Sequence, residues 1–91
     1  VADYISSVQL YDAVPNPAAD ETMISYYLPK SGKVQLQVFD LNGRLVETIQ
    51  APDAQGINSL QYNTAKLAKG SYLITLSTPD GIKTKHLEVM K

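Results

Sequence analysis

The sequence contains no cysteine, no tryptophan and a single histidine. The absence of cysteine excludes disulfides, thiol catalysis and zinc–thiolate sites. Small secreted domains often depend on disulfides, so this one must fold on its hydrophobic core alone. No apolar run approaches the roughly 18 residues of a membrane-spanning helix. The chain starts at Val1 without a basic and then apolar leader, so we expect it to be part of a longer protein.

An excess of either charge is also absent, with 8 Lys+Arg against 9 Asp+Glu and a net charge of −1. A nucleic-acid-binding domain normally carries a basic excess or a basic patch, so this balance argues against that class. The distribution of charge is uneven. All the charged residues within 1–22 are acidic, and every Lys and Arg lies within residues 23–91. This acidic segment is either a solvated lead-in or docks on the basic remainder or on a neighbouring domain.

The length of 91 residues allows one small domain. Residues 23–28, 34–39 and 72–77 alternate with period two, which predicts strands with one core face. Shorter strand candidates are residues 8–11, 45–50, 58–62 and 83–90. The predicted core consists of Ile24, Tyr26, Leu28, Val34, Leu36, Val38, Leu60, Tyr72, Ile74, Leu76, Leu87 and Val89.

The residues between these segments favour antiparallel pairing. Asn42 and Gly43 predict a type I′ hairpin, which needs positive φ at both positions. The run Pro79-Asp80-Gly81 predicts a similar turn between the last two strands. No interval leaves room for a helical crossover between parallel strands. The sequence therefore predicts an all-β fold, a seven-stranded antiparallel β-sandwich of the immunoglobulin or fibronectin type.

The motif Leu67-x-x-Gly70-x-Tyr72 suggests a local feature of such sandwiches. Only residues 64–70 look helical, for a single turn, with Thr64 as a candidate N-cap and Gly70 as the stop. Tyr72 follows at the start of a strand, where sandwich domains place a tyrosine corner whose hydroxyl bonds to upstream backbone. The alternative is a half-buried tyrosine with its hydroxyl in water.

Few residues offer catalytic chemistry, and we predict neither an enzyme nor a bound cofactor or metal. His86 is interpreted as a surface residue of the last strand, since nothing marks the serine and aspartate of a triad. Asp20 and Glu21 could form a carboxylate pair or a calcium site, but they also suit the turn before a strand. The loop from Asp40 to Gly43 lacks the third acid and the distal glutamate of a calcium-binding loop.

Two features remain as interaction signals. The first is the outward-facing apolar set Met23, Tyr27, Phe39 and Leu73, which would form a contact patch on one sheet face or be covered by the N-terminal segment. The second is the lysine-rich segment 83–91. Lysine on an edge strand discourages aggregation, and a terminal edge strand is also a site where a partner can pair with backbone.

An ordered series of motifs resembles the C-terminal sorting domain (type A) of substrates of the type IX, or Por, secretion system. The series covers about residues 12–91 and consists of Val14-Pro15-Asn16-Pro17-Ala18, Ile24-x-Tyr26-x-Leu28, Gly32-x-Val34-x-Leu36-x-Val38-x-Asp40-x-x-Gly43-Arg44-x-Val46, Gly56-x-Asn58, Leu67-x-x-Gly70-x-Tyr72 and Lys91. The individual pieces are common, but their order is specific. Residues 1–11 match no part of the family pattern.

The resemblance implies a non-catalytic secretion signal in a Bacteroidetes-type bacterium. Residues 1–7 would be a linker from an upstream cargo domain, and residues 8–91 the sorting β-sandwich. The cargo, such as a peptidase, a glycoside hydrolase or an adhesin, would cross the periplasm and reach the cell surface or the medium. An outer-membrane translocon would recognise the domain, and a sortase-like protease would remove it.

The resemblance also indicates where recognition lies, in the last strands from Gly70 onward. The candidate recognition residues are Gly70, Tyr72, Lys83, Lys85 and Lys91, and the candidate turn and corner residues are Asn42, Gly43, Gly70 and Tyr72. The alternative function is a fibronectin-like spacer or carbohydrate-binding module of a secreted enzyme. Its exposed aromatic platform would have to come from Tyr4, Tyr11, Tyr27 and Phe39, because tryptophan is absent.

Overall fold

A computed structural model describes residues 8–79 and 81–90, and over these ranges the chain forms strands and no helix. The strands are β1 (Gln9–Leu10), β2 (Glu21–Leu28), β3 (Gln35–Asp40), β4 (Leu45–Ile49), β5 (Gly56–Asn63), β6 (Gly70–Thr78) and β7 (Gly81–Val89). All seven predicted strands are present. β2, β5, β6 and β7 each start two residues earlier than predicted, and β1 is shorter.

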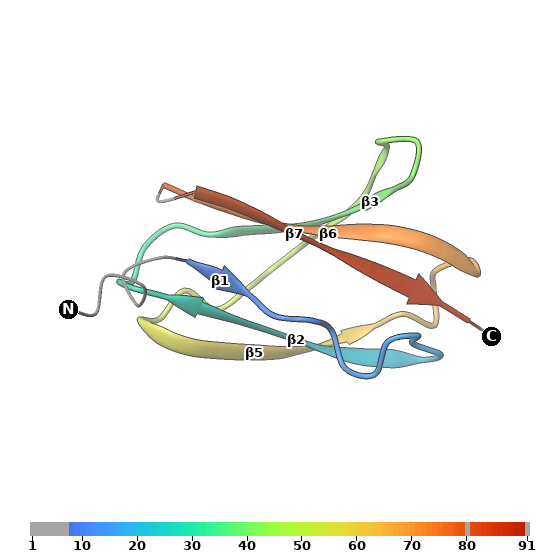
Figure 1. The fold of residues 1–91 in the computed structure, drawn as a ribbon, viewed down its shortest axis with the longest axis horizontal. Coiled ribbons are helices and arrows are strands. Elements are labelled where there is room, and N and C mark those ends of the chain that lie inside the picture. The colour runs from blue at the N-terminus through green and yellow to red at the C-terminus, as the bar shows by residue number, and fades with distance from the viewer. Residues whose placement is uncertain (1–7, 80, 91) are drawn as a thin grey trace.

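Two antiparallel sheets face each other across the core (Figure 1). One sheet has the order β1-β2-β5 and the other has the order β4-β3-β6-β7. The sheets are curved and packed as a sandwich, because the central strands β2, β3 and β6 turn mostly apolar side chains inward at alternate positions. The predicted all-β, seven-stranded antiparallel sandwich is therefore confirmed.

The alternation also placed most of the core. Ten of the twelve predicted core residues are buried, and the exceptions are Val34 and Leu60, which are half-buried at its margin. Leu60 lies on β5, an edge strand of its sheet, so it lacks cover on one side. Val34 precedes β3 and lines an open hollow at one end of the sandwich. The core also includes Val8, Leu10, Ala13, Ala18, Tyr62 and Leu67, which were not predicted.

The hairpin between β3 and β4 differs from the predicted type I′ turn. Gly43 has a φ of +83°, but no other residue type in the described ranges has positive φ, so Asn42 does not. The Gly43 N–H donates to the Asp40 carbonyl at 3.0 Å, and the Asp40 N–H donates to the Arg44 carbonyl at 3.0 Å. The Asp40 carboxylate also accepts the backbone N–H of Asn42 at 2.9 Å. Aspartate at the first position favours a type I turn, and glycine then completes a three-residue loop.

The turn after β5 also differs in its capping residue. The Leu67 N–H donates to the Thr64 carbonyl at 3.0 Å, which closes the single predicted turn. However, the Thr64 hydroxyl donates away from the turn, to the Ala19 carbonyl at 3.1 Å. The Asn63 side chain accepts the Ala65 N–H at 2.8 Å instead. The predicted N-cap at Thr64 is therefore wrong, because that buried hydroxyl serves the N-terminal segment.

The N-terminal segment, defined here as residues 11–20, is fixed along β2. Val14 and Met23 exchange two backbone hydrogen bonds of 3.1 and 2.8 Å. The buried Thr22 hydroxyl donates to the Pro15 carbonyl at 2.8 Å, and the Thr64 N–H donates to the Asp20 carbonyl at 2.8 Å. The segment is thereby held beside the three-stranded sheet before it reaches the other one.

Gly43→Val should destabilise the domain by roughly 1–3 kcal/mol, because a β-branched residue is strained at positive φ. Gly32→Val is the matched control, since an added Cβ meets nothing within 4 Å at either position and only Gly43 has positive φ. Urea denaturation of the two purified variants measures the difference. Equal midpoints for the two variants would contradict a strained φ at Gly43.

Candidate functional site

The predicted recognition residues lie on the hairpin formed by β6 and β7. Gly70 and Tyr72 are at the start of β6, opposite the last residues of β7. Lys83 and Lys85 occupy the first half of β7. The hairpin thus separates Gly70 from Lys83 along its length. Lys91 lies outside the described residues.

Tyr72 forms the predicted tyrosine corner. Its ring is buried, and its hydroxyl donates to the Ala68 carbonyl at 2.6 Å. Gly70, two residues earlier, has a φ of +151°, which side-chain-bearing residues rarely adopt. These two residues therefore fix the path by which the chain enters β6. They offer little surface to a partner, because Tyr72 is buried and Gly70 has no side chain.

Lys83 and Lys85 lie on the same side of β7 as the core residues Leu87 and Val89, as strand alternation requires. They remain accessible because β7 is an edge strand and the facing sheet covers only its second half fully. The Lys85 Nζ is 3.3 Å from Asp12 Oδ1, with the side chains 41% and 80% exposed. Such an exposed ion pair contributes little to stability. An inward-directed charge on an edge strand does oppose edge-to-edge aggregation between copies of the domain.

The contact of Asp12 bears on whether the acidic segment is solvated or docks on the basic remainder of the chain. Among the described acids of residues 1–22, Asp12 is ion-paired to a base of the later chain. Glu21 instead accepts a hydrogen bond from Gln61 at 2.9 Å, and Asp20 is exposed. The acidic segment therefore docks on the rest of the domain mainly through backbone hydrogen bonds, with one ion pair beside them.

The outward edge of β7 is partly occupied by this same segment. The Asn16 side chain donates to the His86 carbonyl and accepts the Glu88 N–H, both at 3.0 Å. Ala18 continues the pairing, since its N–H donates to the Glu88 carbonyl and its carbonyl accepts the Met90 N–H, both at 2.8 Å. Ala18 faces Val89 in a parallel bridge. We call residues 16–18 the edge clasp.

The edge clasp corrects the expectation that the whole last strand presents exposed backbone. The His86 carbonyl, the N–H and carbonyl of Glu88 and the Met90 N–H are already paired within the chain. The same alternation turns the backbone groups of Ile82 and Thr84 outward, and no hydrogen bond to them from beyond β6 is found among the described residues. Among the described residues, the free part of this edge is therefore the first half of β7. Asn16 is the residue from which this clasp could have been predicted, but its partner His86 lies 70 residues away in the sequence.

The outward-facing apolar set does not form a single patch. Met23 and Tyr27 project from β2 in the three-stranded sheet, whereas Phe39 and Leu73 pair across β3 and β6 in the other. The two pairs therefore lie on opposite outer faces of the sandwich. The N-terminal segment lies beside Met23, which remains 40% exposed. Among the described aromatic candidates for a carbohydrate platform, Phe39 is likewise on the opposite face from Tyr27.

His86 is exposed on the outer face of β7, as predicted. Its Nε2 is 3.0 Å from Glu88 Oε1, and the Ser71 hydroxyl donates to the same carboxylate oxygen. A nucleophilic serine needs the imidazole between itself and the acid. Here the carboxylate stands between them, so the imidazole cannot take the serine proton directly. This group is a surface hydrogen-bond cluster.

The acidic candidates serve turns and strand ends. The Asp40 carboxylate accepts two backbone N–H groups of its own hairpin, which confirms the hairpin interpretation. Asp20 lies in the turn before β2, and Glu21 is the first residue of β2. Within residues 8–79 and 81–90, no three histidine or acidic side chains gather as metal ligands would.

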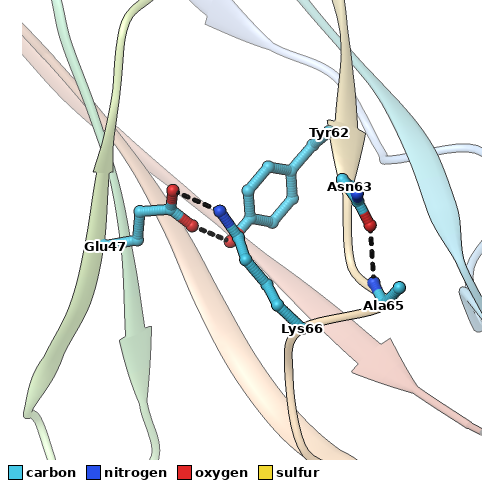
Figure 2. A network of polar contacts seen from close by, with 5 residues as sticks. All are labelled: Glu47, Tyr62, Asn63, Ala65 and Lys66. Atoms are coloured by element: carbon cyan, nitrogen blue, oxygen red, sulfur yellow. Dashed lines mark hydrogen bonds and ion pairs between the residues drawn. The ribbon is translucent and has the colours of Figure 1, made fainter.

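The Glu47 side chain bridges the two sheets (Figure 2). The Tyr62 hydroxyl of β5 donates to Glu47 Oε1 of β4 at 2.7 Å, and Lys66 Nζ is 2.6 Å from Glu47 Oε2. Burial alone raises the pKa of the Glu47 carboxyl, but the hydrogen bonds from Lys66 and Tyr62 and the Lys66 charge outweigh it and lower the pKa below 4.5. Burial, followed by the bond to Glu47, raises the pKa of Tyr62. The network is a cross-sheet staple.

One open hollow lies at the end of the sandwich where β6 passes into β7. It has a volume of about 230 Å³ and is lined by Lys33, Val34, Gln35, Ser77, Thr78 and Pro79. Its walls carry no cluster of acids, histidines or nucleophiles. The most extensive polar contacts of the C-terminal hairpin are instead those of the edge clasp.

Comparison with known families decides what this arrangement belongs to. The model of the secretion system C-terminal sorting domain, the type IX sorting signal, matches residues 11–90. The chain belongs to this family. The match begins at the N-terminal segment and ends just after β7, so the clasped hairpin lies inside it.

The fold of the sorting domain is also similar to one solved structure. The crystal structure of CopC from Methylosinus trichosporium OB3b matches with a TM-score of 0.51 and 21% identity, covering 90% of each chain. At this identity the likeness concerns the fold alone. A comparison with curated proteins gave no match. The described residues of the sorting domain include no helix that could cross a membrane.

Tyr72→Phe should destabilise the sorting domain by about 0.5–1.5 kcal/mol, because it removes the corner hydrogen bond and leaves the Ala68 carbonyl unpaired. Tyr27→Phe is the control, since that half-buried ring lies on an outer face and its hydroxyl has no hydrogen bond among those described. Thermal unfolding of both variants gives the comparison. A melting temperature for Tyr72→Phe as high as that of Tyr27→Phe would contradict the corner.

Glu47→Gln should lower stability at pH 7 by about 0.5–1 kcal/mol, as for other partly exposed ion pairs. A carboxyl with a lowered folded pKa stabilises the fold above its unfolded pKa, and this contribution is lost as pH falls through the folded value. The difference from wild type should therefore shrink below pH 4.5, the reference pKa.

Urea denaturation between pH 7 and about pH 3 measures this dependence, since the window spans the carboxyl titration. Glu21→Gln carries the same charge change on an exposed hydrogen bond and is the control. A constant difference between Glu47→Gln and wild type across the series would rule out a titrating staple.

Proposed function

We propose that this domain is a non-catalytic secretion signal that the outer-membrane translocon of the type IX system recognises during export. The family match over residues 11–90 carries this proposal. The fold supports it, because the described part is a folded unit with its own core. Such a module can present the same surface behind many different cargo domains.

In this proposal residues 8–91 are the sorting domain and residues 1–7 link it to the upstream cargo. The cargo crosses the periplasm and reaches the cell surface or the medium, and a sortase-like protease removes the sorting domain on the way. The N-terminal segment is consistent with cleavage upstream of it, because Ala13 and Ala18 are buried and its backbone is hydrogen-bonded. An extended, accessible chain is what a protease requires.

The recognition residues divide into two groups. Lys83, Lys85 and Lys91 are proposed to contact the translocon, and Lys83 is exposed in the free half of β7. Gly70 and Tyr72 are proposed to act indirectly, by fixing the start of β6 against the end of β7. The Lys85 ammonium is already near Asp12, so a partner carboxylate would replace an exposed and weak contact.

The test of the function is export of a reporter. Residues 1–91 are fused behind a signal peptide and a folded reporter, and surface display is compared in a host with a working type IX translocon and in a translocon-deficient strain. The proposal predicts display only in the first strain. Equal display in both strains, or none in either, would falsify the sorting function.

Changing Lys83, Lys85 and Lys91 to Gln should reduce display strongly while leaving the melting temperature close to that of wild type, since Lys83 and Lys85 do not belong to the core. The matched control changes Lys30, Lys33 and Lys69 to Gln, which removes the same charge from other exposed positions. Removing Lys91 alone is a second variant, because it spares the Met90 N–H that binds Ala18. Normal display of both folded variants would place the signal elsewhere.

A further inference from the structure

The outward edge of β7 consists of two unequal halves. In the half from His86 to Met90 the edge clasp pairs the His86 carbonyl, both outward groups of Glu88 and the Met90 N–H. From Ile82 to Thr84 no such cover is found among the described residues. An edge with unpaired N–H and C=O groups is a template for another extended chain. The edge clasp shows that this particular edge accepts one.

The clasp uses a side chain where a strand would use its backbone. The Asn16 carboxamide supplies one donor and one acceptor at 3.0 Å, which are the two groups that a backbone amide would supply. The backbone of Ala18 then supplies the next donor and acceptor at 2.8 Å. The clasp therefore imitates a short parallel strand that runs in the direction of β7.

The two ends of the clasp are held with different strength. Ala18 is 1% exposed and packs in the core, but Asn16 and the flanking Pro15 and Pro17 are exposed. Exposed hydrogen bonds with few apolar contacts open at low free-energy cost. Opening would begin at Asn16, next to the free half of the edge.

The geometry points to the edge of β7, from Ile82 to Met90, as the surface on which the export machinery adds an extended strand, with the edge clasp as its built-in competitor. This rests on the proposed function and specifies how the same hairpin is read. The partner strand runs parallel to β7 and displaces residues 16–18 after pairing with Ile82 and Thr84. It carries a carboxylate that replaces Asp12 beside Lys85.

A disulfide lock on the clasp tests this directly, because the natural chain has no cysteine to interfere. Ala18→Cys and Val89→Cys are combined, since these residues face each other in the parallel bridge. Paired strands lie about 4.8 Å apart, within the roughly 4.4–6.8 Å that a disulfide spans. Ala18→Cys and Val89→Cys alone are the matched controls.

The locked fusion should lose surface display by about two- to tenfold or more, since one hydrogen bond contributes a factor in that range, while both single variants are displayed. Disulfide formation is checked by mass before and after reduction, and folding by thermal melts. A locked, folded fusion that is displayed as well as the single variants overturns the proposal. Failure of the unmodified fusion to be displayed counts against the sorting function instead.

A second variant avoids the core. Asn16→Asp keeps the acceptor for the Glu88 N–H. It replaces the amide donor to the His86 carbonyl with a carboxylate oxygen, which the carbonyl oxygen repels. Asn63→Asp is the matched control, because Asn63 acts only as an acceptor for the Ala65 N–H. Amide exchange at Glu88 and Met90 should quicken by about tenfold in Asn16→Asp alone.

Display of Asn16→Asp should equal or exceed that of wild type, because the competitor is weakened. A folded Asn16→Asp fusion with faster exchange and lost display would show that the clasp itself is recognised, and it overturns the proposal. Unchanged exchange at Glu88 and Met90 overturns it as well, because the clasp would then not depend on Asn16.

Discussion

Residues 11–20 of the sorting domain form one short stretch of chain that hydrogen-bonds to both sheets. The first part of this stretch is bonded to β2 through Val14 and Pro15, and its end is bonded to β7 through Ala18. Between these contacts the chain passes from the three-stranded sheet to the four-stranded one. A domain of this size buries only about 60–65% of its unfolded surface, so a covalent strand shared by both layers adds order that its thin core alone would not supply.

The opposite side of the sandwich is closed by side chains. There Glu47 of β4 reaches Tyr62 of β5 and Lys66 in the following turn. Both edge strands of the four-stranded sheet thus carry a charge directed toward the core side, Glu47 on β4 and Lys85 on β7, and each charge is matched by a residue from outside that sheet. Charges in this position discourage edge-to-edge aggregation between copies of the domain.

The sequence predicted what depends on neighbours along the chain. Period-two alternation placed the strands and most of the core, and Tyr72 was correctly assigned to a corner because the bond spans only four residues. The type of the Asn42–Gly43 turn was wrong, since the Asp40 side chain selects between two turns that both need the glycine. The role of Asn16 could not be predicted, because a polar residue between two prolines indicates only a loop. Its meaning depends on strand β7, which the sequence places 70 residues further along.

The long separation between Asn16 and its partners also affects how the domain assembles. The bond from the Glu88 N–H to Asn16 joins residues 72 positions apart, so it closes a loop of nearly the whole chain. The entropy lost on closing such a loop must be overcome before the contact contributes favourable free energy. Folds dominated by pairings between distant residues therefore form slowly. The β6–β7 and β3–β4 hairpins can form early from local pairing, whereas the contact between residues 16 and 88 requires both ends of the domain to be present. Completion of the fold therefore reports that the polypeptide has been made and delivered through its last strand.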